Sequence, residues 1–114
     1  MSSPPVSDTP QVPVLAPSGD IDLARSRELG AQLGELAGEP GVAAVLDLTE
    51  VSFLDSVGLG VILKASGRFR RQAKRLVIVA PHGPVLRLLE LSGIGERLAL
   101  AATREEAVAA ASVR

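Results

Sequence analysis

The residues best suited to chemistry form the run Asp55-Ser56-Val57-Gly58-Leu59-Gly60. An apolar run of strand length precedes this segment and a helical apolar period follows it, so the pattern predicts that Ser56 lies at the amino end of a helix. Unpaired backbone N–H groups and the positive end of the helix dipole favour an anion at such a position. An ordinary N-cap formed by Asp55 or Ser56 explains the same residues. Both interpretations remain open from the residues alone.

Enzymatic chemistry has little support around this serine. Ser56 lacks the first glycine of a Gly-x-Ser-x-Gly nucleophile, and His82 is the chain's one possible imidazole base. The segment Gly58-Leu59-Gly60 is not followed by Lys-Ser or Lys-Thr, as a phosphate-binding Walker loop would require. We therefore predict that the chain is not an enzyme.

Metal or cofactor binding is also not indicated. Asp47, Glu50 and Asp55 offer oxygen ligands for magnesium, but a strand-end position for Asp47 and an N-cap role for Asp55 explain these residues without a metal. His82 has no cysteine or second histidine with which to share a zinc ion, so we expect it to be a loop residue. The prediction is that no cofactor or metal is bound.

Composition indicates one folded domain. The chain has 114 residues, 46% hydrophobic and 22% charged, with a formal net charge of -1 and no cysteine. This charge does not favour binding to nucleic acid or an anionic membrane, and the lack of cysteine fits a reducing compartment. The first residues lack the features of a signal peptide, and no apolar run is long enough to span a membrane. We expect a cytoplasmic protein.

Hydrophobic periodicity predicts strands that alternate with helices. Strands are expected at 13–16, 42–48, 76–80 and 98–100, and helices at 23–37, 57–73, 84–92 and 103–113. Asp22 is a candidate N-cap after a turn at 18–22, Thr103 with Glu106 forms a capping box, and Gly93 ends the third helix. Residues 1–11 are rich in serine and proline, so they are expected to be a flexible tail. The order of elements predicts an α/β fold, a mixed sheet of about four to five strands layered with about four helices.

A basic edge follows Ser56 on the predicted helix. Lys64, Arg68, Arg71 and Arg75 recur at i, i+4, i+7 and i+11. Such an edge is either a solvated helix face or a docking edge for an acidic partner, and the sequence leaves both open.

The chain from about residue 12 to 113 resembles the STAS-domain family, in particular the bacterial anti-sigma-factor antagonists. The resemblance rests on Asp47-Leu48-Thr49 and on Leu54 through Gly60, which match a strand followed by Asp-Leu and then Asp-Ser-(Ser/Thr)-Gly-Leu-Gly. Weaker matches are Ser18 through Asp22, similar to an early Gly-Glu-Leu-Asp, and the helix end at 88–94. Val57 departs from the pattern because relatives often carry a second hydroxyl residue there.

This resemblance implies a fold and a function. Residues 12–114 would form a STAS domain, and Ser56 would be the residue phosphorylated by an anti-sigma factor with serine-kinase activity. The unphosphorylated chain would bind that anti-sigma factor and free a sigma factor, and a serine phosphatase would reset the switch. A STAS scaffold or accessory subunit without a phospho-switch, in a stressosome-like or lipid-transport complex, is the alternative. The surface expected to contact the partner comprises Asp20, Asp22, Asp55, Ser56, Val57, Gly58, Leu59, Lys64, Arg68 and Arg71.

Overall fold

The computed structural model of the chain describes residues 12–81, 83–91 and 98–112. The predictions made for the tail at 1–11, for His82 and for Gly93 fall outside these ranges.

Four parallel strands form the central sheet, in the order β1-β3-β5-β6. They are β1 (Val14–Leu15), β3 (Ala43–Asp47), β5 (Arg75–Val79) and β6 (Ala99–Ala101). Strands β3 and β5 are almost wholly buried, as expected for apolar runs covered on both faces. Their register sets Val45 beside Val77 and Leu46 beside Ile78.

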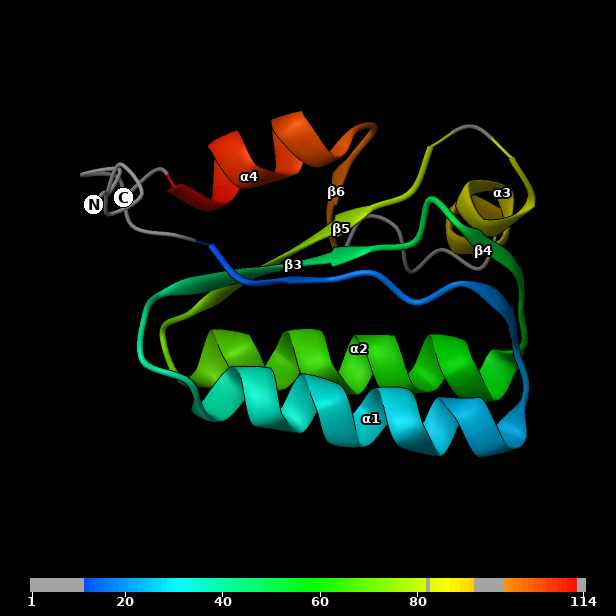
Figure 1. Cartoon of the computed structure of the whole chain (residues 1–114), viewed down its shortest axis with the longest axis horizontal. Helices are drawn as coiled ribbons and strands as arrows, with labels where there is room; N and C mark the ends of the chain where they lie inside the picture. The colour runs from blue at the N-terminus through cyan, green and yellow to red at the C-terminus, as the bar shows by residue number, and fades with distance from the viewer. Residues whose placement is uncertain (1–11, 82, 92–97, 113–114) are drawn as a thin grey trace, which may run out of the picture.

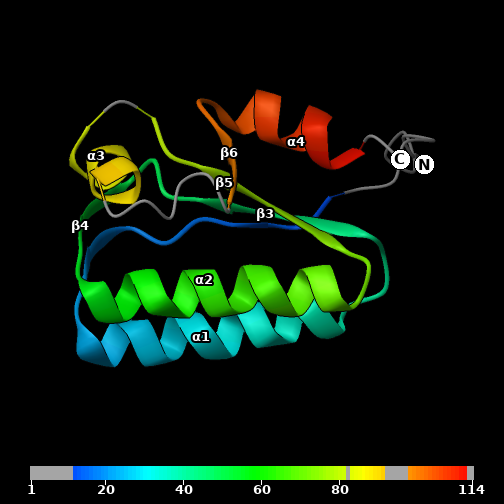
Figure 2. The ribbon, with the colours of Figure 1, turned by 180° about the vertical axis from the view of Figure 1, so that it is seen from behind.

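Helices cover both faces of this sheet (Figure 1). Helices α1 (Leu23–Gly38) and α2 (Ser56–Arg71) lie side by side on one face, and α4 (Arg104–Ser112) lies on the other, an arrangement that Figure 2 shows from behind. The alternation of side chains along the strands divides the core accordingly. Leu46 and Ile78 pack with the α1–α2 side, whereas Val45 and Val77 pack with Ala107 and Ala111 of α4.

A second, two-stranded parallel sheet lies at one end of the molecule. It pairs β2 (Gly19–Ile21) with β4 (Val51–Leu54), and α3 (Pro84–Leu91) packs beside β4. The α/β fold is confirmed, but the segment 18–22 predicted as a turn contains a strand, and β4 was not predicted. The pairs in the described ranges are all parallel, so the sheet is not mixed. The strands β2 and β4 are too short and too distant in sequence for their pairing to show in a local pattern.

Local capping explains where the helices begin. Asp22 caps α1 by accepting a hydrogen bond from Arg25 N at 2.9 Å, as predicted. Thr103 Oγ1 accepts from Glu106 N at 3.1 Å, but the Glu106 carboxylate accepts from Ala102 N at 3.2 Å, one residue before the position that a capping box requires. Within the described ranges, every helix is too short or too polar to cross a bilayer.

Candidate functional site

Ser56 is the first residue of α2, and its side chain is exposed. The preceding residue, Asp55, is extended (φ -92°, ψ -178°) and caps the helix by accepting from Gly58 N at 2.9 Å. The carbonyl of Asp55 accepts from Leu59 N at 3.0 Å. The N–H groups of Ser56 and Val57 have no acceptor within the part of the chain that the structure describes. The serine hydroxyl therefore lies in solvent beside two free backbone donors.

The amino end of α1 lies next to that of α2. Ser26 lies beside Gly58, Gly30 beside Val61 and Gly34 beside Arg68, so the two helices run parallel and start at the same end. In the first turn of α1, Arg25 donates from Nη1 to the carbonyls of Ser18 and Asp20, at 2.5 and 3.0 Å, and so ties α1 to β2. These contacts gather the exposed carboxylates Asp20 and Asp22 at the same end of the molecule as Asp55 and Ser56.

Gly58 is needed for close packing rather than for an unusual backbone angle. A Cβ at Gly58 would lie 2.5 Å from Leu54 Cδ1 and 3.2 Å from Ser26 Oγ, and both of those side chains are buried. The Ser26 hydroxyl has no hydrogen-bond partner within the described residues. A Cβ at Gly60, in contrast, would meet no atom within 4 Å. The two glycines of the motif therefore have different structural roles.

Two residues predicted to contact a partner are buried. Gly58 lies under Leu54, and Leu59 is 6% exposed and belongs to the main core. In this structure they hold the start of α2 in place and offer little surface, and their contact with a partner remains a prediction. Asp20, Asp22, Ser56 and Val57 are exposed, and Asp55 is half-buried.

Phe53 is the surface residue that sequence reasoning missed. Phe69 is 1% exposed and lies in the core, whereas Phe53 is 53% exposed. The register pairs Asp20 with Phe53 and Ile21 with Leu54, which puts the second pair in the core and the first outside. Alternation alone would have misled, because it sets Phe53 on the same side as the buried Val51. The register of the pair shifts between Gly19 and Asp20, so that Ser52 and Phe53 are both exposed and Leu54 is buried.

The basic edge runs along α2 away from Ser56. Lys64, Arg68 and Arg71 are exposed, and none forms an ion pair with another described residue. Lys64 and Arg68 line a hollow between α1 and α2. Arg75 does not continue this edge, because it belongs to β5 and donates from Nη1 to the carbonyl of Ala110 at 2.6 Å. Arginines in the last turn also interact favourably with the helix dipole, so their exposure alone does not establish a docking role.

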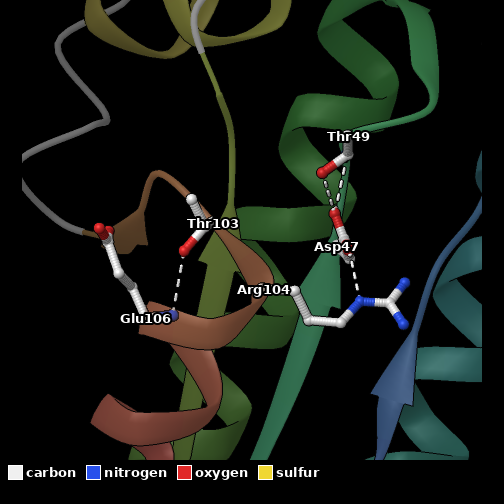
Figure 3. A network of polar contacts seen from close by, with 5 residues as sticks. All are labelled: Asp47, Thr49, Thr103, Arg104 and Glu106. Atoms are coloured by element: carbon white, nitrogen blue, oxygen red, sulfur yellow. Dashed lines mark hydrogen bonds and ion pairs between the residues drawn. The ribbon is translucent and has the colours of Figure 1, made fainter.

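Asp47 lies at the carboxyl end of β3, and both of its carboxylate oxygens accept hydrogen bonds (Figure 3). Its Oδ1 accepts from Thr49 N at 2.9 Å and from Thr49 Oγ1 at 2.5 Å, and its Oδ2 accepts from Arg104 Nε at 2.8 Å. Burial raises the pKa of this carboxyl, but the bonds from Thr49 and the charge and bond of Arg104 outweigh burial and hold the pKa below its ordinary value. Among the described residues, no three His, Cys, Asp or Glu side chains come together as a metal site.

Comparisons with known proteins identify the fold and the family. The family model for the STAS domain matches residues 3–107. An anti-sigma-F factor antagonist, RsfB, from Mycobacterium tuberculosis is 32% identical over 103 residues, 90% of this chain and 84% of that protein. The crystal structure of an anti-sigma factor antagonist from Mycobacterium paratuberculosis has a TM-score of 0.78 and 28% identity, covering 86% of this chain and 83% of that one.

A more distant solved structure shares the fold. It is the Bacillus cell fate determinant SpoIIAA in its phosphorylated form, with a TM-score of 0.64 and 22% identity, covering 85% of this chain and 87% of that one. The mycobacterial relatives are closer in sequence, at 28% and 32% identity. On these relatives and on the family model, the chain belongs to the STAS-domain family, and to the anti-sigma factor antagonists within it.

Proposed function

We propose that this protein binds an anti-sigma factor in its unphosphorylated form and that phosphorylation of Ser56 ends this binding. The anti-sigma factor would be the serine kinase that modifies Ser56, and a serine phosphatase would reset the switch. The protein itself would be substrate and ligand, not an enzyme, and would act in the cytoplasm without binding nucleic acid or membrane. The observation that carries the proposal is the exposed Ser56 hydroxyl at the start of α2, in a chain of the antagonist family.

The start of α2 can accommodate a phosphate on Ser56. The free N–H groups of Ser56 and Val57 and the positive end of the helix dipole favour an anion at this position. Asp55 already uses Gly58 N, so a phosphate would not need to displace the cap. The SpoIIAA structure is an example of this fold in a phosphorylated protein. We therefore expect the fold to survive modification.

A partner surface that fits the neutral hydroxyl would not fit the phosphate. Phosphorylation adds about 1.5 to 2 negative charges at neutral pH, and removing such a group from water costs several kcal/mol unless the partner pairs it. Because about 1.4 kcal/mol corresponds to a tenfold change in affinity, this cost is enough to abolish binding. The proposed contact surface comprises Asp20, Asp22, Asp55, Ser56 and Val57, with Lys64, Arg68 and Arg71 as a second, more distant part of the same domain.

Variants at Ser56 test the proposal directly. The chain would be incubated with ATP and the purified anti-sigma factors of its own organism, and the modified residue would be mapped by mass spectrometry. We expect the wild type to lose binding after ATP treatment, and Ser56→Ala to bind and to resist inactivation. Ser52→Ala is a matched control, because Ser52 is also exposed but lies on β4. Phosphorylation and inactivation of Ser56→Ala at the wild-type rate would refute the assignment.

A further inference from the structure

Three large apolar side chains are exposed at the end of the molecule that carries Ser56. Phe53 is 53% exposed on β4, Leu23 is 53% exposed at the first position of α1, and Val57 is 46% exposed at the second position of α2. We call these three residues the apolar anchor. Exposed apolar side chains gathered beside polar ones are typical of protein-binding surfaces, whereas single exposed ones are common and need no explanation.

The exposure of Phe53 is set by the pairing of β2 with β4. The inner face of this small sheet is in the core, with Ile21 1% and Leu54 4% exposed. Phe53 and its neighbour across the pair, Asp20, share the outer face. Phe53 thus cannot enter the core without turning Leu54 out of it. The fold therefore leaves Phe53 about half exposed, next to Asp20.

We propose that the apolar anchor is the main affinity determinant for the anti-sigma factor, with Phe53 inserted into an apolar pocket whose rim is basic. This inference rests on the function proposed above and specifies the chemistry of the partner. Aromatic side chains at the centre of an interface carry a large share of the binding free energy, because they bury much area with little loss of conformational entropy.

The rim is basic because the surroundings of the anchor are acidic. Asp20 pairs with Phe53 across β2 and β4, Asp22 precedes Leu23, and Asp55 lies between Phe53 and Val57 in sequence. None of these carboxylates forms an ion pair within the described ranges. Asp22 and Asp55 each use Oδ1 for a cap, to Arg25 N and Gly58 N, so the second oxygen of each is available. A surface that brings Lys or Arg to these carboxylates would gain association rate and orientation.

The anchor also explains how a phosphate on Ser56 would act. Ser56 is exposed next to Val57 in the first turn of α2 and follows Phe53 by three residues, so a partner that covers the anchor would also cover the Ser56 side chain. A neutral hydroxyl is tolerated there, but a hydrated dianion is not. The loss of binding then follows from desolvation at the anchor, provided that the Lys or Arg side chains that pair Asp20, Asp22 and Asp55 do not reach the phosphate.

The test measures the affinity of the intact chain for the purified anti-sigma factor that binds the wild type, by calorimetry without ATP. Phe53→Ala should raise Kd by at least about thirtyfold, as for an interface hot spot, and Phe53→Leu should recover most of that loss. Val42→Ala is the matched control, because Val42 is also an exposed apolar residue, at 62%. It lies at the far end of the molecule from Ser56, since its carbonyl accepts from Arg75 N just beyond the carboxyl end of α2. The Kd of this variant should stay within twofold of the wild-type value. Asp20→Lys should slow association and weaken its dependence on salt.

Each outcome decides a separate point. If the wild type binds and Phe53→Ala binds equally well, the anchor is refuted and the proposed function stands. If the wild type binds none of the organism's anti-sigma factors, the proposed function is refuted and the anchor with it. Should Phe53→Ala fail to fold, Leu23→Ser and Val57→Ser give the same test, because both side chains lie exposed in first helical turns. Unchanged affinity in both would also refute the anchor.

Discussion

Asp47 closes β3 and Asp55 follows β4, so the molecule carries two aspartates at the carboxyl ends of its strands. Asp47 is 4% exposed and accepts bonds from Thr49 and Arg104 with both of its oxygens. Asp55 is half-buried and accepts only at Oδ1 among the described residues, and the next side chain, Ser56, is exposed. The first arrangement joins three parts of the fold and leaves no group for a ligand. Among the described residues, the second leaves a hydroxyl, a carboxylate oxygen and two N–H groups without partners, which supports the proposed role of Ser56.

The largest expected effect comes from breaking the Asp47 network. Asp47→Ala leaves Thr49 and Arg104 without their acceptor and should lower the free energy of unfolding by about 2–4 kcal/mol, measured by urea denaturation. Binding to the anti-sigma factor by the folded protein should not change. Asp55→Asn is the matched change at the other aspartate: Asn is an equally good N-cap, so stability should hold while affinity falls. If Asp47→Ala weakens binding more than Asp55→Asn does, the division between the two regions is wrong.

The two glycines of the motif provide the next test. Gly58→Ala would force its Cβ against Leu54 and Ser26 and should lower the free energy of unfolding by about 1–3 kcal/mol. Gly60→Ala enters open space in the same helix and should raise it by about 0.5–1 kcal/mol, because alanine loses less backbone entropy on folding. Thermal denaturation of both variants checks the signs, and two changes of the same sign would contradict the packing described here.

The acid dependence of stability sharpens the same comparison with a smaller effect. The pKa of Asp47 is lowered in the folded protein, so the stabilisation from its ionised form is present above the ordinary carboxyl pKa. It is lost as pH falls through the lower, folded pKa. Asp47→Asn should therefore flatten the fall in stability at acid pH, measured by denaturation between about pH 2 and 5. Asp55→Asn serves as the reference, and an equal flattening in both variants would contradict a special role for Asp47.

Local chemistry allowed much of this molecule to be predicted from the sequence. The caps at Asp22 and Asp55 are contacts within three residues, and the helices follow from apolar periodicity. Contacts between distant segments could not be derived in the same way. The bond from Arg104 to Asp47 spans 57 residues, and the pairing of β2 with β4 decides that Phe53 faces outwards. The packing role of Gly58 likewise depends on Ser26, which belongs to another helix. The position of Ser56 was predictable because the cap and the helix start are consecutive in sequence. The strand just before it, β4, and the exposure of Phe53 on that strand were not predictable in this way, because both depend on the pairing with β2.

The smallest expected effect concerns the basic edge. Like the Ser56 end, this edge is exposed, but favourable interaction with the helix dipole is enough to explain it, just as the hydrogen bonds of Asp47 explain that residue without a ligand. If the edge only stabilises the carboxyl end of α2, replacing both Arg68 and Arg71 with Glu should lower stability slightly and leave association unchanged. If it attracts an acidic part of the partner, the double variant should associate roughly three- to tenfold more slowly at low salt, because rim charges act mainly on the association rate. We expect the second result, with the difference vanishing at high salt as the charges are screened. Stopped-flow measurements at two ionic strengths decide this, with Arg68→Glu compared singly to Arg70→Glu. Both of these arginines are exposed in the last turn and carry the same charge, so equal rates would assign the edge to helix stability.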